Sequence, residues 1–433
     1  MRISLILLLN ICLVNSNLLF SQSWMKTFSG PVDVSPRQLH ESYDHGYLVG
    51  ADYYWQGWII KTDINGDLLW DIKFGSETIW WMEGFDNTLD GGIIATGATD
   101  TLDPNWWDPY IIKMNYCGQV EWCHIFHTEN DLDYGVKILS LPNDSYIFLL
   151  QNWGYSQTEE SIWLMHLDGS GEILWEQRYF QDDTLVSPWY GNALYLTPDD
   201  NYLITSTCYS PIEGQTQPYW LWPVLILADS TGEAIFEIPW GYTLPFSEHV
   251  GGEGYQSVQI NNSIYSCISN YHGINPNYAP CLIKTSISGV PEYYKDLIED
   301  TEYGKASTLT RLNDSTLFIG AWYDTGYYAN PTLSVLKTDT MGDVLVEKIL
   351  NHSEYIPKDA ILTYDNKYLI TAPDYVNNHY IFYLWKLNEN LEYDSIYTQP
   401  RRYDSLCPDT ITSGTLLFQC DVVTGIQEPV INT

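Results

Sequence analysis

Aromatic side chains are the residues of this chain whose types and spacing best suit chemistry. Flat rings beside carboxylates suit sugars, because a ring stacks on the face of a saccharide while polar groups bind its hydroxyls. Tyr and Trp also anchor protein partners at interfaces. The competing interpretation is structural, since such rings also pack between sheets or beneath their own loops. Ten loop rings form the candidate ligand-binding set: Tyr54, Trp55, Trp106, Trp107, Trp153, Tyr155, Trp220, Tyr271, Tyr327 and Tyr375.

Motifs for catalysis or metal binding are missing from the sequence. It contains no GxSxG, HExxH, glycine-rich phosphate loop or EF-hand loop, so we assign no catalytic residue. His124 and His127 lie three residues apart, but alternation along a strand does not direct both at one metal, so we interpret them as packed or solvated. The absence of a CxxC pair argues against zinc. We predict no cofactor, with calcium in the polar turns as the remaining alternative.

The charge balance argues against two classes of partner. The 433 residues include 55 Asp and Glu against 19 Lys and Arg, a formal net charge of −36. This charge repels phosphate backbones and anionic lipid headgroups. Beyond the N-terminus, no segment is long and apolar enough to span a bilayer. We therefore expect no nucleic acid partner and no membrane insertion, and we expect a glycan or protein ligand. The composition leaves the oligomeric state open.

An internal repeat positions these rings. The turn KTDINGDLLW at 61–70 returns as KMNYCGQVEW at 113–122, HLDGSGEILW at 166–175 and KTDTMGDVLV at 337–346. Successive copies of this turn lie 49 to 61 residues apart, which indicates one supersecondary unit per copy. The seven copies are anchored at Asp63, Asn115, Asp168, Asp229, Ser286, Asp339 and Asn388.

Each copy contains four short strand-like segments, which in the first copy are 34–40, 46–51, 58–62 and 68–74. They are rich in Val, Ile, Tyr and Trp and are bounded by Gly, Asn, Asp or Pro. In the turn, the Asp side chain can accept a hydrogen bond from the backbone two residues on, and Gly supplies a positive φ. The seventh copy has Leu391 in place of this Gly. We predict an all-β fold, a seven-bladed β-propeller of four-stranded antiparallel blades.

Two features predict how the blades pack and how the ring closes. Trp70, Trp122, Trp175 and Phe236 occupy equivalent positions, where a large flat side chain would fill the wedge between adjacent blades. The segment WMKTFSG at 24–30 resembles WDIKFG at 70–75, so we expect this N-terminal strand to pair with the last blade and close the ring. The segment 391–397 competes for the same place.

One face of the propeller is expected to be aromatic and acidic. The loops with the ten candidate rings share a face with the connections between blades, and these connections contain acids such as Glu299 and Asp300. We favour a secreted binding or scaffolding module that docks a glycan or protein on this face. The alternative is an extracellular polysaccharide-degrading enzyme, a lyase or hydrolase, with acidic residues at the channel mouth.

The N-terminus predicts export. Arg2, the apolar stretch 3–14 and the small residues Ser16 and Ser21 form the pattern of a signal peptide cleaved after Ser21. Disulfides are permissible in an exported protein. Proximity in sequence favours three pairs and leaves Cys208 over: Cys267 with Cys281, Cys407 with Cys420, and Cys117 with Cys123.

The repeats also carry a resemblance. DGGIIATG at 90–97, followed by DPYIIKMN at 108–115, a turn and a Trp, resembles secreted β-propeller proteins of Bacteroidetes with a C-terminal type IX secretion sorting domain. The resemblance implies a propeller and an extracellular or cell-surface address; the sorting domain itself is absent from the sequence. The turn also resembles the Trp-docking motif of quinoprotein propellers, one residue shorter, which adds a quinoprotein dehydrogenase as a third hypothesis. We divide the chain into a signal peptide at 1–21, a propeller at 22–398 and a tail with a disulfide at 399–433.

Overall fold

The computed structural model describes residues 24–75, 78–127, 132–152, 161–180, 187–210, 220–240, 251–272, 277–299, 301–324, 331–350, 353, 355–403 and 405–424. For residues 187–192, 209–210, 220, 271–272 and 277, the description covers the backbone alone. The expected signal peptide at 1–21 lies outside these ranges.

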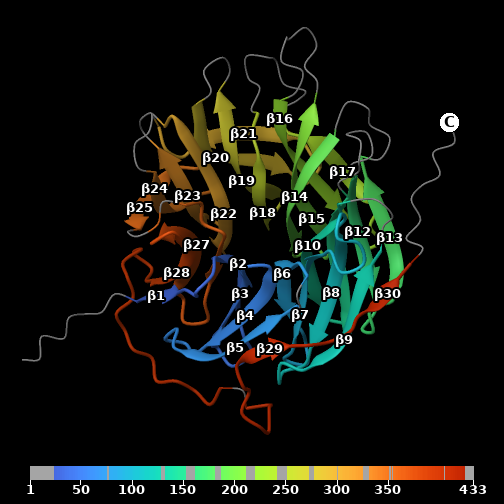
Figure 1. Cartoon of the computed structure of the whole chain (residues 1–433). Coiled ribbons are helices and arrows are strands. Elements are labelled where there is room, and N and C mark those ends of the chain that lie inside the picture. The colour runs from blue at the N-terminus through green and yellow to red at the C-terminus, as the bar shows by residue number, and fades with distance from the viewer. Residues whose placement is uncertain are drawn as a thin grey trace, which may run out of the picture.

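Antiparallel strands are arranged as sheets about a central axis, an all-β propeller (Figure 1). Five sheets contain four strands each and hold repeats 3 to 7 in chain order. Repeat 3 consists of β10 (Tyr134–Leu141), β11 (Ser145–Asn152), β12 (Ser161–Leu167) and β13 (Ile173–Tyr179), and repeat 4 of β14 (Ser187–Leu196), β15 (Tyr202–Ser210), β16 (Trp220–Ala228) and β17 (Ala234–Pro239). Repeat 5 consists of β18 (Gly254–Ile260), β19 (Ser263–His272), β20 (Asn277–Ser286) and β21 (Pro291–Asp296), and repeat 6 of β22 (Tyr303–Asn313), β23 (Thr316–Asp324), β24 (Thr332–Asp339) and β25 (Val344–Leu350). The fifth sheet combines β26 (Asp359–Leu362), β27 (Tyr368–Val376) and β28 (His379–Leu387) of repeat 7 with β1 (Met25–Phe28).

The sixth sheet has ten strands and contains repeats 1 and 2. Repeat 1 is β2 (Val34–Glu41), β3 (Tyr47–Tyr53), β4 (Gln56–Thr62) and β5 (Leu68–Phe74), and repeat 2 is β6 (Trp80–Asn87), β7 (Ile93–Thr99), β8 (Asp108–Met114) and β9 (Val120–Phe126). Two short strands from the C-terminal tail, β29 (Gly414–Leu416) and β30 (Asp421–Val423), complete it.

The predicted number of separate blades is therefore wrong. We expected seven four-stranded sheets, and the structure has five, because the first two repeats are continuous with each other. A single parallel residue pair, Gln56 with Trp80, joins β4 to β6, and the Trp80 N–H donates to the Trp55 carbonyl at 2.7 Å. This contact lies between two repeats, where the pattern inside each repeat gives no information. The prediction of four-stranded antiparallel blades is confirmed.

The sheets bury their apolar residues against one another. All seven residues of β8 are buried, because a neighbouring sheet covers each face. One apolar cluster unites Ile147 and Leu164 of repeat 3 with Ile204 and Trp222 of repeat 4, and similar clusters lie between other neighbours. Fully burying one such side chain stabilises the fold by roughly 1.5–3 kcal/mol. The core is therefore distributed around the ring between adjacent sheets.

The repeated turn has the geometry that its residues predict. The Asp63 carboxylate accepts hydrogen bonds from the Asn65 and Asp67 N–H groups, both at 2.8 Å, and Gly66 has a φ of 75°. In the seventh copy, Leu391 adopts the same left-handed conformation with a φ of 62°. A non-glycine residue in this region is strained by the clash of its Cβ. The Leu391 side chain is completely buried, which explains why the strain is tolerated.

Large side chains fill the space between successive repeats, as we predicted. Three of the four predicted rings lie against the turn glycine of the next repeat, so closely that a Cβ on that glycine would lie 2.6 to 2.9 Å from the ring. Trp70 is the exception: it is buried in the cluster that repeats 1 and 2 share, but Gly118 meets Ile72 in its place. The three contacts are Trp122 with Gly171, Trp175 with Gly232 and Phe236 with Gly289. The Trp122 indole also donates to the Gly169 carbonyl at 3.1 Å. The turn glycines therefore serve both the hairpin and the packing between repeats.

The N-terminal strand takes the outer place in the last sheet. β1 pairs antiparallel with β28 over four residues, from Met25 opposite Trp385 to Phe28 opposite Phe382. The Trp24 ring packs against Gly66 of repeat 1, just as the other rings pack against their turn glycines. The competing segment 391–397 makes only an isolated bridge, in which Tyr393 pairs with Leu387.

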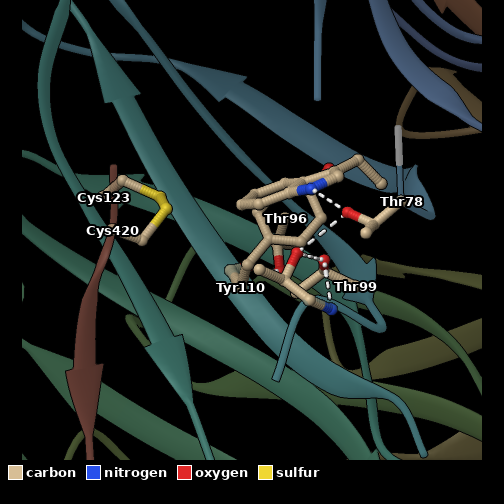
Figure 2. The surroundings of a disulfide bond; sticks show 8 residues. Thr78, Thr96, Thr99, Tyr110, Cys123 and Cys420 are labelled. Atoms are coloured by element: carbon tan, nitrogen blue, oxygen red, sulfur yellow. Dashed lines mark hydrogen bonds between the residues drawn. A yellow bond between two sulfur atoms is a disulfide. The ribbon is translucent and has the colours of Figure 1, made fainter. Parts of the chain in front are cut away.

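The C-terminal tail runs along the outer strands of repeats 1 and 2. β29 pairs parallel with β5, and β30 pairs parallel with β9. Two disulfides fasten it, Cys117 to Cys407 and Cys123 to Cys420, and Figure 2 shows the second of these joining β9 to the tail. The four cysteines are the expected ones, but the predicted partners are wrong. The tail lies parallel to the edge strand β9, so each tail cysteine meets a cysteine of repeat 2.

The predicted bond between Cys267 and Cys281 is also wrong, and the sheet register gives the reason. Cys267 on β19 lies opposite Leu282 on β20, and Cys281 lies opposite Ile268. A shift of one residue places the two thiols on opposite faces of the sheet. Cys267 accordingly packs with Val258 in one apolar cluster and Cys281 packs in another, and both are free thiols.

Candidate functional site

A ring of β-bulges surrounds the central axis. The first strand of each of repeats 1 to 6 contains a bulge, as between Pro36 and Gln38 in β2. A bulge inserts one unpaired residue and redirects its side chain, and bulges are enriched next to functional sites. The inserted residues with described side chains are Arg37, Glu83, Val136, Tyr255 and Ser307. Lys358 takes the corresponding place in repeat 7, directly before β26.

The residue after the bulge connects neighbouring repeats. Its side-chain oxygen accepts a hydrogen bond from a backbone N–H of the next repeat, at 2.8 to 3.1 Å. The pairs are Gln38 with Phe85, Gln256 with Leu309, and Asp359 with Leu39. The bulged residue itself is left to face the axis.

These bulged residues line a central cavity of about 550 Å³. Its volume lies within the usual range for small-ligand sites. Besides the five bulged residues and Lys358, its wall is formed by Trp81, Trp107, Tyr134, Lys137, Glu253, Gln256, Ile356 and Pro357. The Trp81 and Trp107 rings meet edge to face, with centroids 4.4 Å apart. The cavity thus combines large rings with charged groups.

An ion-pair network crosses the wall between repeats 1 and 2. The Arg37 guanidinium binds Asp52 at 2.6 Å and Glu83 at 3.1 Å, and Asp52 also accepts a hydrogen bond from the Met82 N–H at 2.9 Å. Burial, together with the charge of Glu83, raises the pKa of Asp52 to about 6, although Arg37 opposes the shift. Burial disfavours the charge on Arg37, but the two carboxylates outweigh it and raise its pKa above the ordinary value.

A second group of charges lies on repeats 5 and 6. The Lys305 ammonium binds Glu253 at 2.7 Å, and the Tyr255 hydroxyl donates to the same carboxylate. Burial and the Glu253 charge raise the pKa of Tyr255 well above its usual value, so this phenol stays protonated. On repeat 3, Lys137 donates to the Gln38 amide oxygen at 2.8 Å, and burial lowers the pKa of Lys137.

Lys358 differs from Arg37 and Lys305, which have ion-pair partners, and from Lys137, which donates to an amide oxygen. Among the residues that the structure describes, the Lys358 ammonium has no ion-pair partner, and its side chain is exposed to the cavity. Burial by the surrounding wall, then the charge of Arg37, lower the pKa of Lys358 to about 8. The charged groups that face it are Arg37 on β2, Asp52 on β3, Glu83 on β6 and Lys305 on β22.

A smaller cavity of about 300 Å³ adjoins Lys358 between repeats 7 and 1. Its wall contains Asp33, Val34, Ser35, Asp52, Tyr54, Tyr355, Lys358, Pro373 and Tyr380. The Tyr380 ring meets Tyr355 at 5.7 Å and Tyr375 at 4.9 Å between centroids. Lys358 lines both cavities, so we call the smaller one the side cavity and treat the two as neighbouring parts of one candidate site.

The structure brings several of the candidate rings to this site. Trp107 lines the central cavity, and Tyr54 lines the side cavity with 58% of its surface exposed. Trp55 contacts Tyr54 at 5.2 Å, and Tyr375 reaches the side cavity through Tyr380. Trp106 is half-buried and lines neither cavity.

The other predicted rings lie outside what the structure describes. Trp153, Tyr155 and Tyr327 fall in undescribed segments, and Trp220 and Tyr271 have a described backbone without described side chains. These five therefore stay predictions.

The sequence analysis missed the cations of the site. We expected acidic residues at the channel mouth, but the central cavity has three cations, Arg37, Lys137 and Lys358, against the acids Glu83 and Glu253. The sequence did contain a signal for the bulged residues. Most of them lie 30 to 32 positions before the anchor residue of the turn in their repeat, and Arg37 lies 26 positions before Asp63. Aligning the repeats on that position would have placed these side chains in one ring.

Two further searches concern metals and membranes. Within the described ranges, no group of three or more His, Cys, Asp and Glu side chains gathers as a metal ion would require. In the same residues, no helix combines the length and the apolar character needed to cross a bilayer.

The fold is shared with solved structures of diverse proteins. No protein-family model matches the chain, and no curated protein matches it. The polysaccharide lyase Uly1 is 9% identical with a TM-score of 0.51, over 83% of this chain and 90% of that one. A catalytically inactive virginiamycin B lyase from Staphylococcus aureus is 13% identical with a TM-score of 0.49, over 83% and 98%. A protein of unknown function from Bacteroides caccae is 12% identical with a TM-score of 0.35, over 60% and 81%. At such identities the likeness concerns the fold alone.

Proposed function

We propose that this protein is a secreted binding module that holds a saccharide in the central cavity. The observation that carries this proposal is the Trp81 and Trp107 pair, which lies in the wall of a cavity of about 550 Å³ beside hydrogen-bonding side chains. Indole faces stack on the C–H faces of pyranose rings, while carboxylates, amides and ammonium groups bind hydroxyls. The side cavity extends the same chemistry with Tyr54 and Tyr380.

Binding is better supported than catalysis. A glycosidase needs two carboxyl groups, one of them protonated, across the scissile bond. The two carboxylates of the central cavity instead have cationic partners, Glu83 with Arg37 and Glu253 with Lys305. A scaffold that recognises a saccharide needs only shape, rings and polar groups. The fold likeness to a polysaccharide lyase does not change this preference, because the fold is shared by proteins of many functions.

We also propose that the protein is exported and that β1 closes the ring of sheets. Two disulfides join the tail to repeat 2, and such bonds persist in oxidising compartments outside the cytosol. The pairing of β1 with β28 supports closure by the N-terminal strand. Sequencing the N-terminus of protein recovered from culture medium would test export, with Gln22 as the expected first residue.

The binding function is tested with a Trp107→Ala variant. Isothermal titration against a panel of neutral and acidic oligosaccharides should identify a ligand of the wild type, and Trp107→Ala should weaken its binding about 10-fold, which corresponds to about 1.4 kcal/mol. Tyr116→Ala is the control, because Tyr116 is exposed in the turn at the opposite end of repeat 2. If no saccharide in the panel binds, the proposal is wrong, and pull-down from culture medium would then test for a protein partner.

A further inference from the structure

The central cavity gathers positive charge in a protein that has little of it. The chain has only 19 Lys and Arg and a formal net charge of −36. Three of these cations, Arg37, Lys137 and Lys358, nevertheless line one cavity, and Lys305 lies beside its Glu253. Burying cations near one another costs free energy through repulsion and desolvation. This cost indicates that the cluster is retained for a ligand.

Lysines with a purely structural role look different in this fold. Lys61, Lys113 and Lys386 occupy one equivalent position in repeats 1, 2 and 7, and each side chain is at most 3% exposed. Each binds an Asp in the first hairpin of its own repeat: Asp44, Asp90 and Asp365 respectively. Lys358 has neither feature, because its side chain is exposed to the cavity and lacks an ion-pair partner among the described residues.

The neighbour of Lys358 already performs the structural task at this position. Asp359 accepts hydrogen bonds from the Leu39 N–H at 2.8 Å and from the Gln256 amide at 3.3 Å, which connects repeat 7 to repeats 1 and 5. Lys358 is not needed for these connections. Its ammonium therefore remains available to a molecule in the cavity.

We propose that Lys358 is an anion subsite that makes an acidic saccharide the preferred ligand. This inference rests on the proposed saccharide-binding function. The anionic group is a carboxylate or a sulfate ester, since both present oxygens to an ammonium group. Lys358 lines both cavities, so a charged sugar unit beside it places its neighbours near Trp107 on one side and Tyr54 on the other.

The net charge of the protein does not prevent this binding. Exposed charges are screened over about 8 Å at physiological ionic strength, so most of the −36 charge acts weakly inside the cavity. The nearest acids, Asp52 and Glu83, are already paired with Arg37. Counting Lys137 and the Lys305–Glu253 pair as well, the four cations at the central cavity exceed its three acids by one charge, so a ligand anion there meets a net positive charge.

The test compares saccharides that differ only in charge. Isothermal titration uses an oligogalacturonate, the same oligosaccharide with its carboxyl groups reduced to alcohols, and a sulfated oligosaccharide. The wild type should bind at least one acidic ligand about 10-fold more tightly than the neutral one, because 1.4 kcal/mol corresponds to tenfold. Lys358→Gln should abolish this preference by weakening the acidic ligand far more than the neutral one, and Lys358→Arg should retain it. Lys295→Gln is the control, since Lys295 lies on β21 and binds Asp343 away from the cavity.

The outcomes separate the two proposals. Equal binding of acidic and neutral ligands, or a preference that survives in Lys358→Gln, would overturn the anion subsite and leave the saccharide site standing. Failure of every saccharide to bind would overturn both. Preference for the carboxylate or for the sulfate would identify the anionic group. Thermal melts of the three variants within a few degrees of the wild type would establish that each change acts on binding.

Discussion

Removing either disulfide of the C-terminal tail should cost about 3 kcal/mol of unfolding free energy, whereas removing both should cost about 9 kcal/mol. The two bonds, Cys117–Cys407 and Cys123–Cys420, span 290 and 297 residues. On the chain-entropy model, closing a first loop of this length restricts the unfolded chain by about 6 kcal/mol. The effect is expected in the unfolded state, so it does not depend on the tail's contacts.

The second bond contributes less because the first has already joined the same regions. With one bond in place, the other closes only the short segments between Cys117 and Cys123 and between Cys407 and Cys420, a loop of about 20 residues worth about 3 kcal/mol. Either single deletion therefore leaves the long loop closed by the remaining bond. Only the double deletion opens the long loop. Its cost in unfolding free energy therefore exceeds the sum of the costs of the two single deletions.

Urea unfolding followed by tryptophan fluorescence measures these differences under oxidising conditions. The variants are Cys117→Ser with Cys407→Ser, Cys123→Ser with Cys420→Ser, and all four together. Dithiothreitol should reduce the wild type to the stability of the fourfold variant and should leave that variant unchanged. Single deletions that each cost half of the double deletion, or a double deletion no worse than a single one, would refute the reasoning.

Four further predictions concern stability and pH. Gly232→Ala should destabilise the fold by roughly 2 kcal/mol in urea unfolding, because its φ of 87° is unfavourable for Ala and a Cβ would lie 2.6 Å from a neighbouring tryptophan ring. Leu391→Gly should also destabilise the fold by about 2 kcal/mol, since the loss of a completely buried Leu outweighs the roughly 1 kcal/mol of relieved backbone strain; greater stability would contradict this. Lys61→Met should cost about 3–5 kcal/mol by leaving the buried Asp44 carboxylate without its cation, and adding Asp44→Asn should recover part of the loss. Affinity for an acidic saccharide should fall about 10-fold from pH 7 to pH 9, because Lys358, with its pKa lowered to about 8, loses its charge as the pH rises; Lys358→Gln should remove this dependence in titrations across the range.

Local features of the fold were predictable because their causes lie within a few residues. The Asp63 turn requires an acceptor at the first position and a positive φ three residues later, and both needs are visible in the sequence. The predicted strand at 68–74 matches β5, and the segment predicted at 34–40 is one residue shorter than β2. Leu391 was identified as the atypical turn residue, and its φ of 62° shows the conformation that the other copies give to Gly.

The candidate site was predictable only in its aromatic part. Trp107 and Tyr54 were found because rings in loops are unusual and stand out in a sequence. Arg37, Lys137 and Lys358 were missed because they are about 100 and 220 residues apart and none of them belongs to a recognisable sequence motif. Their common direction depends on bulges and on the radial arrangement of the sheets, which bring one position of every repeat to the same axis.

The sequence by itself determined the repeat, the four-stranded unit, the turn and the rings between repeats, because hydrogen-bonding side chains, backbone φ and alternating apolar residues act over short distances. The tertiary structure decided which cysteines pair, how repeats 1 and 2 join in one sheet, and which charges line the central cavity. These features depend on residues far apart in the chain, and only the packing of the sheets against one another sets their distances. The anion subsite proposed at Lys358 belongs to this second group, since it depends on a side chain that lines both cavities and has no ion-pair partner among the described residues.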